Sequence, residues 1–259
     1  MSQKKVCMFV WNHFTNDARV LRECTALAES GYEVDLICIH DWKQEDLPLW
    51  EKRQEGFTVT RVKNRVPVLQ KIFGLAKRAK RVAMKNIATM TVLGLLLALG
   101  IWKFPMITVS LLLLALLFSQ RKVATLLVRG AILFRMVRAG LKKKYDIYHS
   151  NDLNTLPQGF ICAKILRRKK LIYDSHEVQT SRTGYNSNIY GVMEKFFIKF
   201  CDVMIMENHT RAKYIEELYG FYPKVIHNYP FVSRPELSKS IDLHGILNVS
   251  RDEPILLYQ

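Results

Sequence analysis

The apolar run from 87 to 118 limits what this chain can fold into, because its 32 residues include one charged side chain, Lys103. As one straight helix the run would be about 48 Å long, well beyond the roughly 30 Å hydrocarbon core of a bilayer. Pro105 disfavours a helical conformation at Phe104, and a charge at mid-bilayer costs at least about 2.5 kcal/mol. We therefore predict a turn beside Lys103 and a hydrophobic helical hairpin over 87–118.

Basic residues surround this run. Residues 56–145 contain 18 Lys and Arg but neither Asp nor Glu, so this segment carries a charge of +18. Because the formal net charge of the whole chain is +16, the remainder of the chain carries −2. By the positive-inside rule, both ends of the run lie on the cytoplasmic side, and two arms of about 22 Å each would dip into a bilayer and return. The pattern predicts an anionic membrane surface as partner, at the cytoplasmic face of the plasma (inner) membrane. A buried hairpin inside a soluble protein is the alternative.

The sequence disfavours a disulfide framework, a bound metal and a nucleic-acid partner. The five cysteines show neither C-x-x-C nor C-x-x-H spacing, so the sequence predicts no disulfide framework and no bound metal. A nucleic-acid-binding protein is the lowest-ranked hypothesis, because aromatic residues do not alternate with the basic ones as a stacking surface requires. The sequence leaves the oligomeric state open.

Outside the apolar run, strand and helix patterns alternate, which indicates an α/β, Rossmann-like parallel sheet with helices on both faces. We predict one such domain over 1–227 with a basic, hydrophobic insertion at 66–144. A linker follows at 228–253, and 254–259 is predicted as the first strand of a truncated second domain. Strands are predicted at 4–11, 32–39, 57–62, 146–150, 170–173, 202–206 and 224–226, and helices at 17–30, 68–86, 122–142, 155–166, 192–200 and 212–219.

Ligands of such sheets bind outside the carboxyl ends of the strands, so the residues after each strand are the candidate site. The loop 12–19 after the first strand lacks the glycines of a dinucleotide-binding loop. Asn16, Asp17 and Arg19 are candidates for substrate binding. The alternative role is helix capping by Thr15, Asn16 or Asp17.

The turn after the strand at 146–150 carries Asn151, Asp152 and Asn154. Asp152 is a candidate catalytic residue, because a carboxylate there can take a proton from a hydroxyl placed within about 3 Å. Asn151 and Asn154 are candidates for substrate binding. Capping of the next helix is the alternative role of Asp152.

The strand at 170–173 is followed by Asp-Ser-His-Glu, which packs several polar groups into one turn. His176 is the second candidate catalytic residue, and Ser175 and Glu177 are candidates for substrate binding. Asn228, where the chain leaves the last strand, is the final candidate, with a simple turn as the alternative.

Four segments together resemble the N-terminal domain of GT-B glycosyltransferases of the family 4 type. They are NDARVLRECTALAESGYEVDLI at 16–37, NDLNTLPQG at 151–159, KKLIYDSHEV at 169–178 and VIHNYP at 225–230. The resemblance covers roughly 1–60 and 145–259, and the basic hydrophobic insertion lies outside the usual pattern. Relatives often have a glycine pair after the first strand, which this chain lacks.

The resemblance implies an acceptor-binding half whose nucleotide-sugar donor, UDP- or GDP-linked, binds to a second domain without a metal. It places Asp152 at a cleft position where relatives have an acidic or His residue, and His176 and Glu177 in the following polar turn. The implied activity is retaining sugar transfer, of the hexosyltransferase type, to a lipid-linked or cell-envelope polysaccharide acceptor. The fragment alone is expected to be inactive. A membrane-bound adaptor that kept the fold and lost the chemistry is the alternative.

Overall fold

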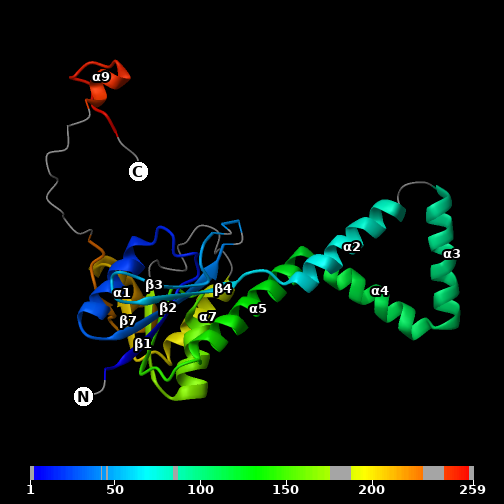
Figure 1. Cartoon of the computed structure of the whole chain (residues 1–259), viewed down its shortest axis with the longest axis horizontal. Helices are drawn as coiled ribbons and strands as arrows, with labels where there is room; N and C mark the ends of the chain where they lie inside the picture. Colours follow the sequence, from blue (N-terminus) through cyan, green and yellow to red (C-terminus); the bar gives the residue numbers. More distant parts are fainter. Residues whose placement is uncertain are drawn as a thin grey trace. The chain divides into compact units, whose positions relative to one another are not determined.

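The computed structural model describes six stretches of the chain, residues 3–41, 43–44, 46–83, 87–175, 188–229 and 242–256. They divide into two compact units, Met1–His227 and Asn228–Gln259. The first unit contains an eight-stranded sheet in the order β3-β4-β2-β1-β5-β6-β7-β8, parallel throughout except for the β3–β4 pair (Figure 1). The strands are β1 Lys5–Phe9, β2 Glu33–His40, β3 Trp50–Lys52, β4 Thr58–Lys63, β5 Ile147–Asn151, β6 Lys170–Ser175, β7 Val203–Met206 and β8 Lys224–Val225.

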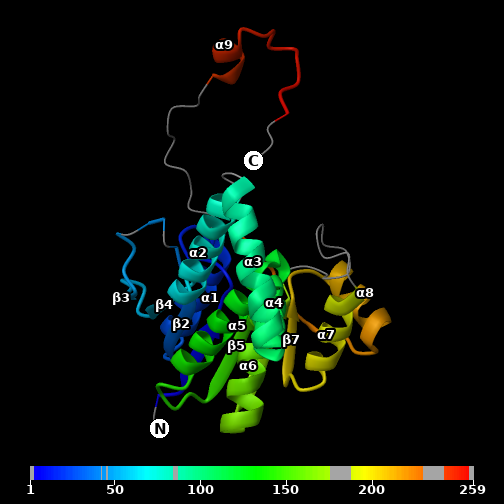
Figure 2. The ribbon, with the colours of Figure 1, turned by 90° about the vertical axis from the view of Figure 1, so that its right-hand side faces the viewer.

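Helices cover both faces of this sheet, which confirms the predicted α/β class. One face carries α1, and the other carries α5 to α8, of which Figure 2 shows α5, α6 and α7 in front of the strands. The helices are α1 Ala18–Glu29, α2 Pro67–Ala83, α3 Ile87–Lys103, α4 Pro105–Ser119, α5 Arg121–Gly140, α6 Leu156–Phe160 with a π-helical turn Ile161–Arg167, α7 Asn188–Ile198, α8 His209–Tyr219 and α9 Leu243–Leu247.

Two hydrophobic cores follow from the alternation of side chains along the strands. Met8 of β1 packs beneath Val20 and Cys24 of α1, whereas its neighbour Phe9 packs on the opposite face with Met136 of α5. All five side chains are essentially excluded from solvent. The central strands are therefore buried on both sides, as parallel strands between helical layers must be.

The strand order reverses between β1 and β5, because the chain runs from β1 outward to β4 and β3 and then returns to β5 on the other side of β1. Such a switch point leaves a crevice outside the carboxyl ends of the two strands, since their connections depart in opposite directions. The residues that follow β1, β5, β6 and β7 therefore define the candidate site.

The apolar run forms α3 and α4, which meet at Phe104, so the predicted break beside Lys103 is confirmed. In Figure 1 the two helices meet at an angle and do not lie side by side along their length, so the structure does not show the predicted hairpin. Their large side chains are exposed, for example Leu95 at 65% and Leu113 at 61%. Within the described residues, no helix has the combination of length and apolar character that crossing a bilayer requires.

Three local features differ from the sequence-based expectation. The short edge strand β3 was not predicted, because Trp-Glu-Lys offers no apolar alternation and only the pairing with β4 defines it. The helix predicted at 155–166 is α6 continued by a π-helical turn that ends in a left-handed Arg168. In the second unit, the predicted linker contains α9, capped by the side chain of Asp242, while described residues 254–256 form no strand.

Candidate functional site

A buried charge network lies between α1 and the carboxyl ends of the strands. Arg19 on α1 places Nη2 2.5 Å from Asp174 Oδ1, Nε 3.2 Å from Glu23 Oε1 and Nη1 3.4 Å from Glu207 Oε2. Asp174 belongs to the carboxyl end of β6, and Glu207 is the first residue after β7. Arg211 on α8 also pairs with Glu207. One guanidinium thus joins α1 to the ends of two strands.

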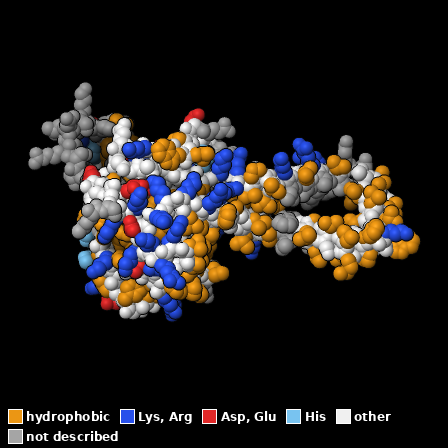
Figure 3. All heavy atoms as spheres, turned by 60° about the horizontal axis from the view of Figure 1, so that its bottom comes forward, with side chains coloured by type: hydrophobic (Ala, Val, Ile, Leu, Met, Phe, Trp, Pro, Cys, Tyr) orange, Lys and Arg blue, Asp and Glu red, His pale blue; other side chains and the backbone are white. Residues whose placement is uncertain are grey.

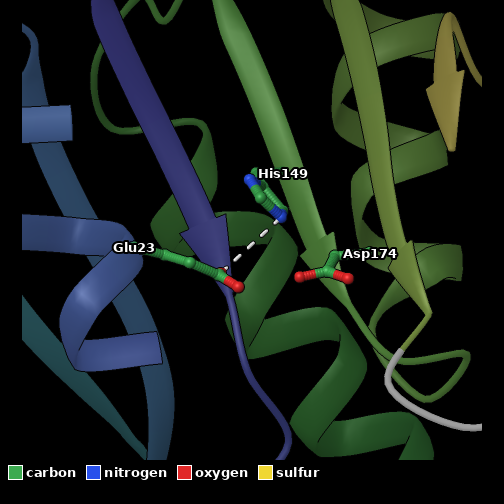
Figure 4. A group of neighbouring side chains, drawn as sticks. All are labelled: Glu23, His149 and Asp174. Atoms are coloured by element: carbon green, nitrogen blue, oxygen red, sulfur yellow. Dashed lines mark ion pairs between the residues drawn. The ribbon is translucent and has the colours of Figure 1, made fainter. Parts of the chain in front are cut away.

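His149 of β5 completes the cluster, with Nε2 4.0 Å from Glu23 Oε2. Figure 4 shows Glu23 reaching from α1 toward His149, with Asp174 beside them at the end of β6. One ligand atom from each of these three residues lies within 4.8 Å of the others. The guanidinium of Arg19 already supplies the positive charge between the two carboxylates, so we interpret the cluster as an ion-pair network and not as a metal site.

Burial raises the pKa of the Glu23 carboxyl well above its usual value of 4.5, and the neighbouring charge of Asp174 raises it further, while Arg19 opposes both. The folded state therefore holds this proton more tightly than the unfolded state. Stability arising from Glu23 is fully present below about pH 4.5 and is lost as the pH rises through the raised pKa.

Replacing Glu23 with glutamine should remove this pH-dependent loss, because the amide oxygen can still accept a hydrogen bond from Arg19 and carries no charge. We expect Glu23→Gln to increase the free energy of unfolding at about pH 8 by about 1.4 kcal/mol for each unit of raised pKa, and to change it little near pH 4. Urea unfolding across this pH range measures the difference. Glu29→Gln, at an exposed position on the same helix, is the control; an equal gain at both pH values contradicts the explanation.

Asp152 lies in the turn after β5 with a left-handed backbone, φ 66°. Its N–H donates to the carbonyl of Asp174 at 2.9 Å, which fixes this turn against the end of β6. Thr155 occupies the N-cap position of the next helix, although its side chain makes no capping hydrogen bond, so Asp152 is not the N-cap residue. A non-glycine residue in this conformation is uncommon, although Asp tolerates it better than most, and such residues concentrate at functional sites.

A second buried carboxylate lies near Asp152. Glu194 of α7 accepts hydrogen bonds from the hydroxyls of Tyr173 at 2.6 Å and Tyr219 at 2.8 Å. Burial raises the pKa of Glu194, and the negative charge of Asp152 adds to the effect. Because the two tyrosines hold Glu194 in place and Asp152 is less buried, Asp152 is the carboxylate better placed to meet a substrate.

The structure assigns packing or capping roles to several predicted site residues. Asp17 caps α1, its Oδ1 accepting from Val20 N at 3.1 Å, and Asn16 precedes it in an exposed position. Asn151 is buried and donates to the carbonyl of Phe9 at 3.1 Å, which joins β5 to β1.

The remaining candidates are Ser175, Asn154, Asn228, His176 and Glu177. Ser175 is buried, and its hydroxyl donates to the Tyr173 hydroxyl oxygen at 3.3 Å. Asn154 lies half-buried in the same turn as Asp152. Asn228 is exposed and begins the second unit, so it is described apart from this site. His176 and Glu177 lie outside the described residues.

Sequence reasoning selected Arg19 and placed Asp174 in the polar turn after 170–173, but it missed Glu23, Glu207 and His149. A signal existed for two of them. Glu23 stands four residues after Arg19, so both face the same side of α1. Glu207 directly follows a strand, the position already chosen for inspection after other strands. His149 gave no signal, because a histidine inside a buried strand is usually structural.

No protein-family model and no curated protein sequence matches the chain. Solved structures do. Sucrose-phosphate synthase from Thermosynechococcus elongatus aligns over 97% of this chain and 54% of its own, with 12% identity and a TM-score of 0.55. Anabaena HepE in complex with UDP-glucose aligns over 86% of this chain and 43% of its own, with 13% identity and a TM-score of 0.46.

A UDP-forming α,α-trehalose-phosphate synthase from Burkholderia vietnamiensis aligns over 83% of this chain and 43% of its own, with 10% identity and a TM-score of 0.43. The conclusion about the fold depends on the sucrose-phosphate synthase, which has the highest TM-score of the three. The chain spans about half the length of these proteins. Its α/β fold is that of one half of a GT-B glycosyltransferase.

Proposed function

We propose that this chain is the acceptor-side half of a membrane-associated glycosyltransferase. The enzyme transfers a sugar, with retention, from a nucleotide-sugar to a lipid-linked or cell-envelope polysaccharide acceptor. The observation that carries the proposal is a GT-B half-fold with the carboxylate of Asp152 at the carboxyl end of β5, next to the switch point. That is where a doubly wound sheet binds ligands.

Asp152 is the proposed base that takes the proton of the acceptor hydroxyl as the new glycosidic bond forms, while the bond from the sugar to the phosphate breaks and the nucleoside diphosphate leaves. The hydrogen bond from its N–H to Asp174 positions the carboxylate, and the Arg19 network holds Asp174 in turn. The UDP- or GDP-linked sugar binds to a second domain, and no residue described here is assigned to the donor.

Membrane association is proposed from the character of α2 to α5. Figure 3 shows hydrophobic side chains gathered on the helices that project from the sheet, with Lys and Arg near their base, along one edge and at the far end. Exposed apolar surface of this extent usually marks an interaction site. Each Lys or Arg near an anionic bilayer contributes about 1 kcal/mol. We place this arm at the cytoplasmic leaflet of the inner membrane.

Transfer is tested with the complete gene product in membranes, supplied with radiolabelled UDP- and GDP-sugars. We expect the label to move into an organic extract. A folded, membrane-bound protein that transfers neither type of sugar would instead be a non-catalytic adaptor, and the proposed enzyme activity would be wrong.

Attachment is tested separately by replacing residues 87–118 with a short Gly-Ser linker. We expect the variant to leave the membrane fraction while keeping the circular dichroism of the folded domain. Retention in the membrane fraction after this deletion would contradict the role given to the arm.

A further inference from the structure

A cavity of about 590 Å³ lies between the residues that follow β1 and the helices α2 and α5, which flank the apolar helices α3 and α4. It lies among the residues after β1, the connection from β4 to α2, and the facing sides of α2 and α5. Its wall combines aromatic and aliphatic side chains with two guanidinium groups. The residues that the argument uses are Arg65, Leu69, Phe73, Val128, Arg129 and Ile132.

The wall of the cavity is fixed at its base. Arg135 of α5 donates to the carbonyl of Arg65 at 2.9 Å and also to that of Lys63, which ties the β4–α2 connection to α5. Ile132 is buried in the main core. The cavity is therefore anchored to the sheet, although α2 and α5 continue beyond it.

The charge of the cavity selects for an anion. No Asp or Glu lines it, and none occurs between residues 56 and 145. Arg65 of the β4–α2 connection and Arg129 of α5 line the same cavity, and a guanidinium can donate two parallel hydrogen bonds to a phosphate. A phosphate group complements the positive charge of these two guanidinium groups, whereas a neutral sugar does not.

The apolar part of the wall selects for a hydrocarbon chain. Leu69 and Phe73 of α2 face Val128 and Ile132 of α5, and the same two helices lead into α3 and α4 with their exposed leucines. A ligand with its phosphate at the arginines can therefore place its hydrocarbon chain against these four apolar side chains. The opposite end of the cavity reaches Asn12, directly after β1.

We infer that this cavity binds the phosphate and the first part of the hydrocarbon chain of a lipid phosphate, and so presents the acceptor to the carboxyl ends of the strands. The inference rests on the proposed function, because it names the lipid-linked acceptor as the substrate class. Arg129 is a binding residue in this scheme and takes no part in the bond-making step.

Binding is tested without transfer, using the full chain in nanodiscs of zwitterionic lipid. The probe is a long-chain alkyl phosphate with a diazirine in its chain, and the comparison is the same alcohol without phosphate. We expect photolabelling within 64–73 and 124–132, at least about tenfold stronger for the phosphate. Equal labelling by the alcohol would overturn the phosphate site.

Two pairs of variants make the test specific. Arg129→Gln should weaken labelling at least about tenfold. Lys122→Gln, which removes one charge from the same helix outside the cavity, should leave it unchanged. Ala124→Trp should block the cavity, whereas Leu126→Trp, at a 70% exposed position outside the lining, should not. Wild-type labelling of both Arg129→Gln and Ala124→Trp would overturn the inference.

The labelling experiment and the sugar-transfer experiment can succeed or fail separately. Labelling that follows the variants as expected, in a protein that transfers no sugar, would keep the lipid-phosphate site and remove the glycosyltransferase. Transfer to lipid that is unaffected by Arg129→Gln and Ala124→Trp would keep the glycosyltransferase and remove the site.

Discussion

Replacing Arg19 with methionine will lower the free energy of unfolding by about 3–5 kcal/mol, the usual cost of removing one partner from a buried ion pair. The side chain of Arg19 is 10% exposed, and that of its closest partner Asp174 is 1% exposed. Without the guanidinium, Glu23 and Asp174 share one buried space, and Glu207 keeps its ion pair with Arg211. A domain with a typical stability of about 5–15 kcal/mol would lose a large part of it.

Urea unfolding in neutral detergent, followed by circular dichroism, measures this loss. The control is Arg53→Met, which removes an exposed pair with Glu55 and should cost less than about 1 kcal/mol. Adding Asp174→Asn to Arg19→Met should restore part of the loss, because one uncompensated charge is removed. Equal losses for Arg19→Met and Arg53→Met would show that the network does not hold α1 to the sheet.

The sequence predicted the order of strands and helices because parallel strands between helical layers have an apolar character that can be recognised locally. The end of α1 could also be predicted, because glycine is the residue that most readily adopts the left-handed conformation that ends a helix. Gly31 has this conformation, with φ 84°. β3 was missed because its strand conformation depends on pairing with β4, and three residues carry no period of their own.

The site was harder to predict than the fold, because its chemistry depends on distances across the sheet. Arg19 and Asp174 are separated by 155 positions in sequence and by 2.5 Å in space. No local sequence pattern indicates that two residues so far apart in the chain form an ion pair. Asn151 shows the converse, because this polar residue at the end of a strand was predicted to bind substrate, whereas its buried amide joins β5 to β1.

The carboxylates at this edge of the sheet form two groups, one around Arg19 and one around Glu194. On the α1 face, Arg19 compensates the carboxylates that it contacts, so these groups serve to hold the strand ends in place. On the other face, Glu194 is held by two tyrosine hydroxyls. Asp152 stands between them in a less buried turn whose backbone is fixed by Asp174. The carboxylate of Asp152 is half-buried, and a rigid support around it is what proton transfer requires.

Replacing Asp152 with asparagine should therefore lower the rate of sugar transfer by about 10²–10⁴-fold, the usual contribution of a positioned base. Asparagine has nearly the same shape and tolerates the left-handed conformation at φ 66°, so the turn and the fold should persist. Because the substrate is still bound and only its deprotonation is impaired, kcat should fall while the KM for the donor changes little.

Initial rates of radiolabelled sugar transfer by the complete gene product in membranes measure this effect. The matched control is Asp146→Asn, the same chemical change just before the other end of β5, where the carboxylate pairs with Lys169; its rate should equal that of the wild type. If Asp152→Asn transfers sugar as fast as this control, Asp152 is not the base. Deprotonation of the acceptor would then have to come from the donor phosphate or from a residue outside the described part of the chain.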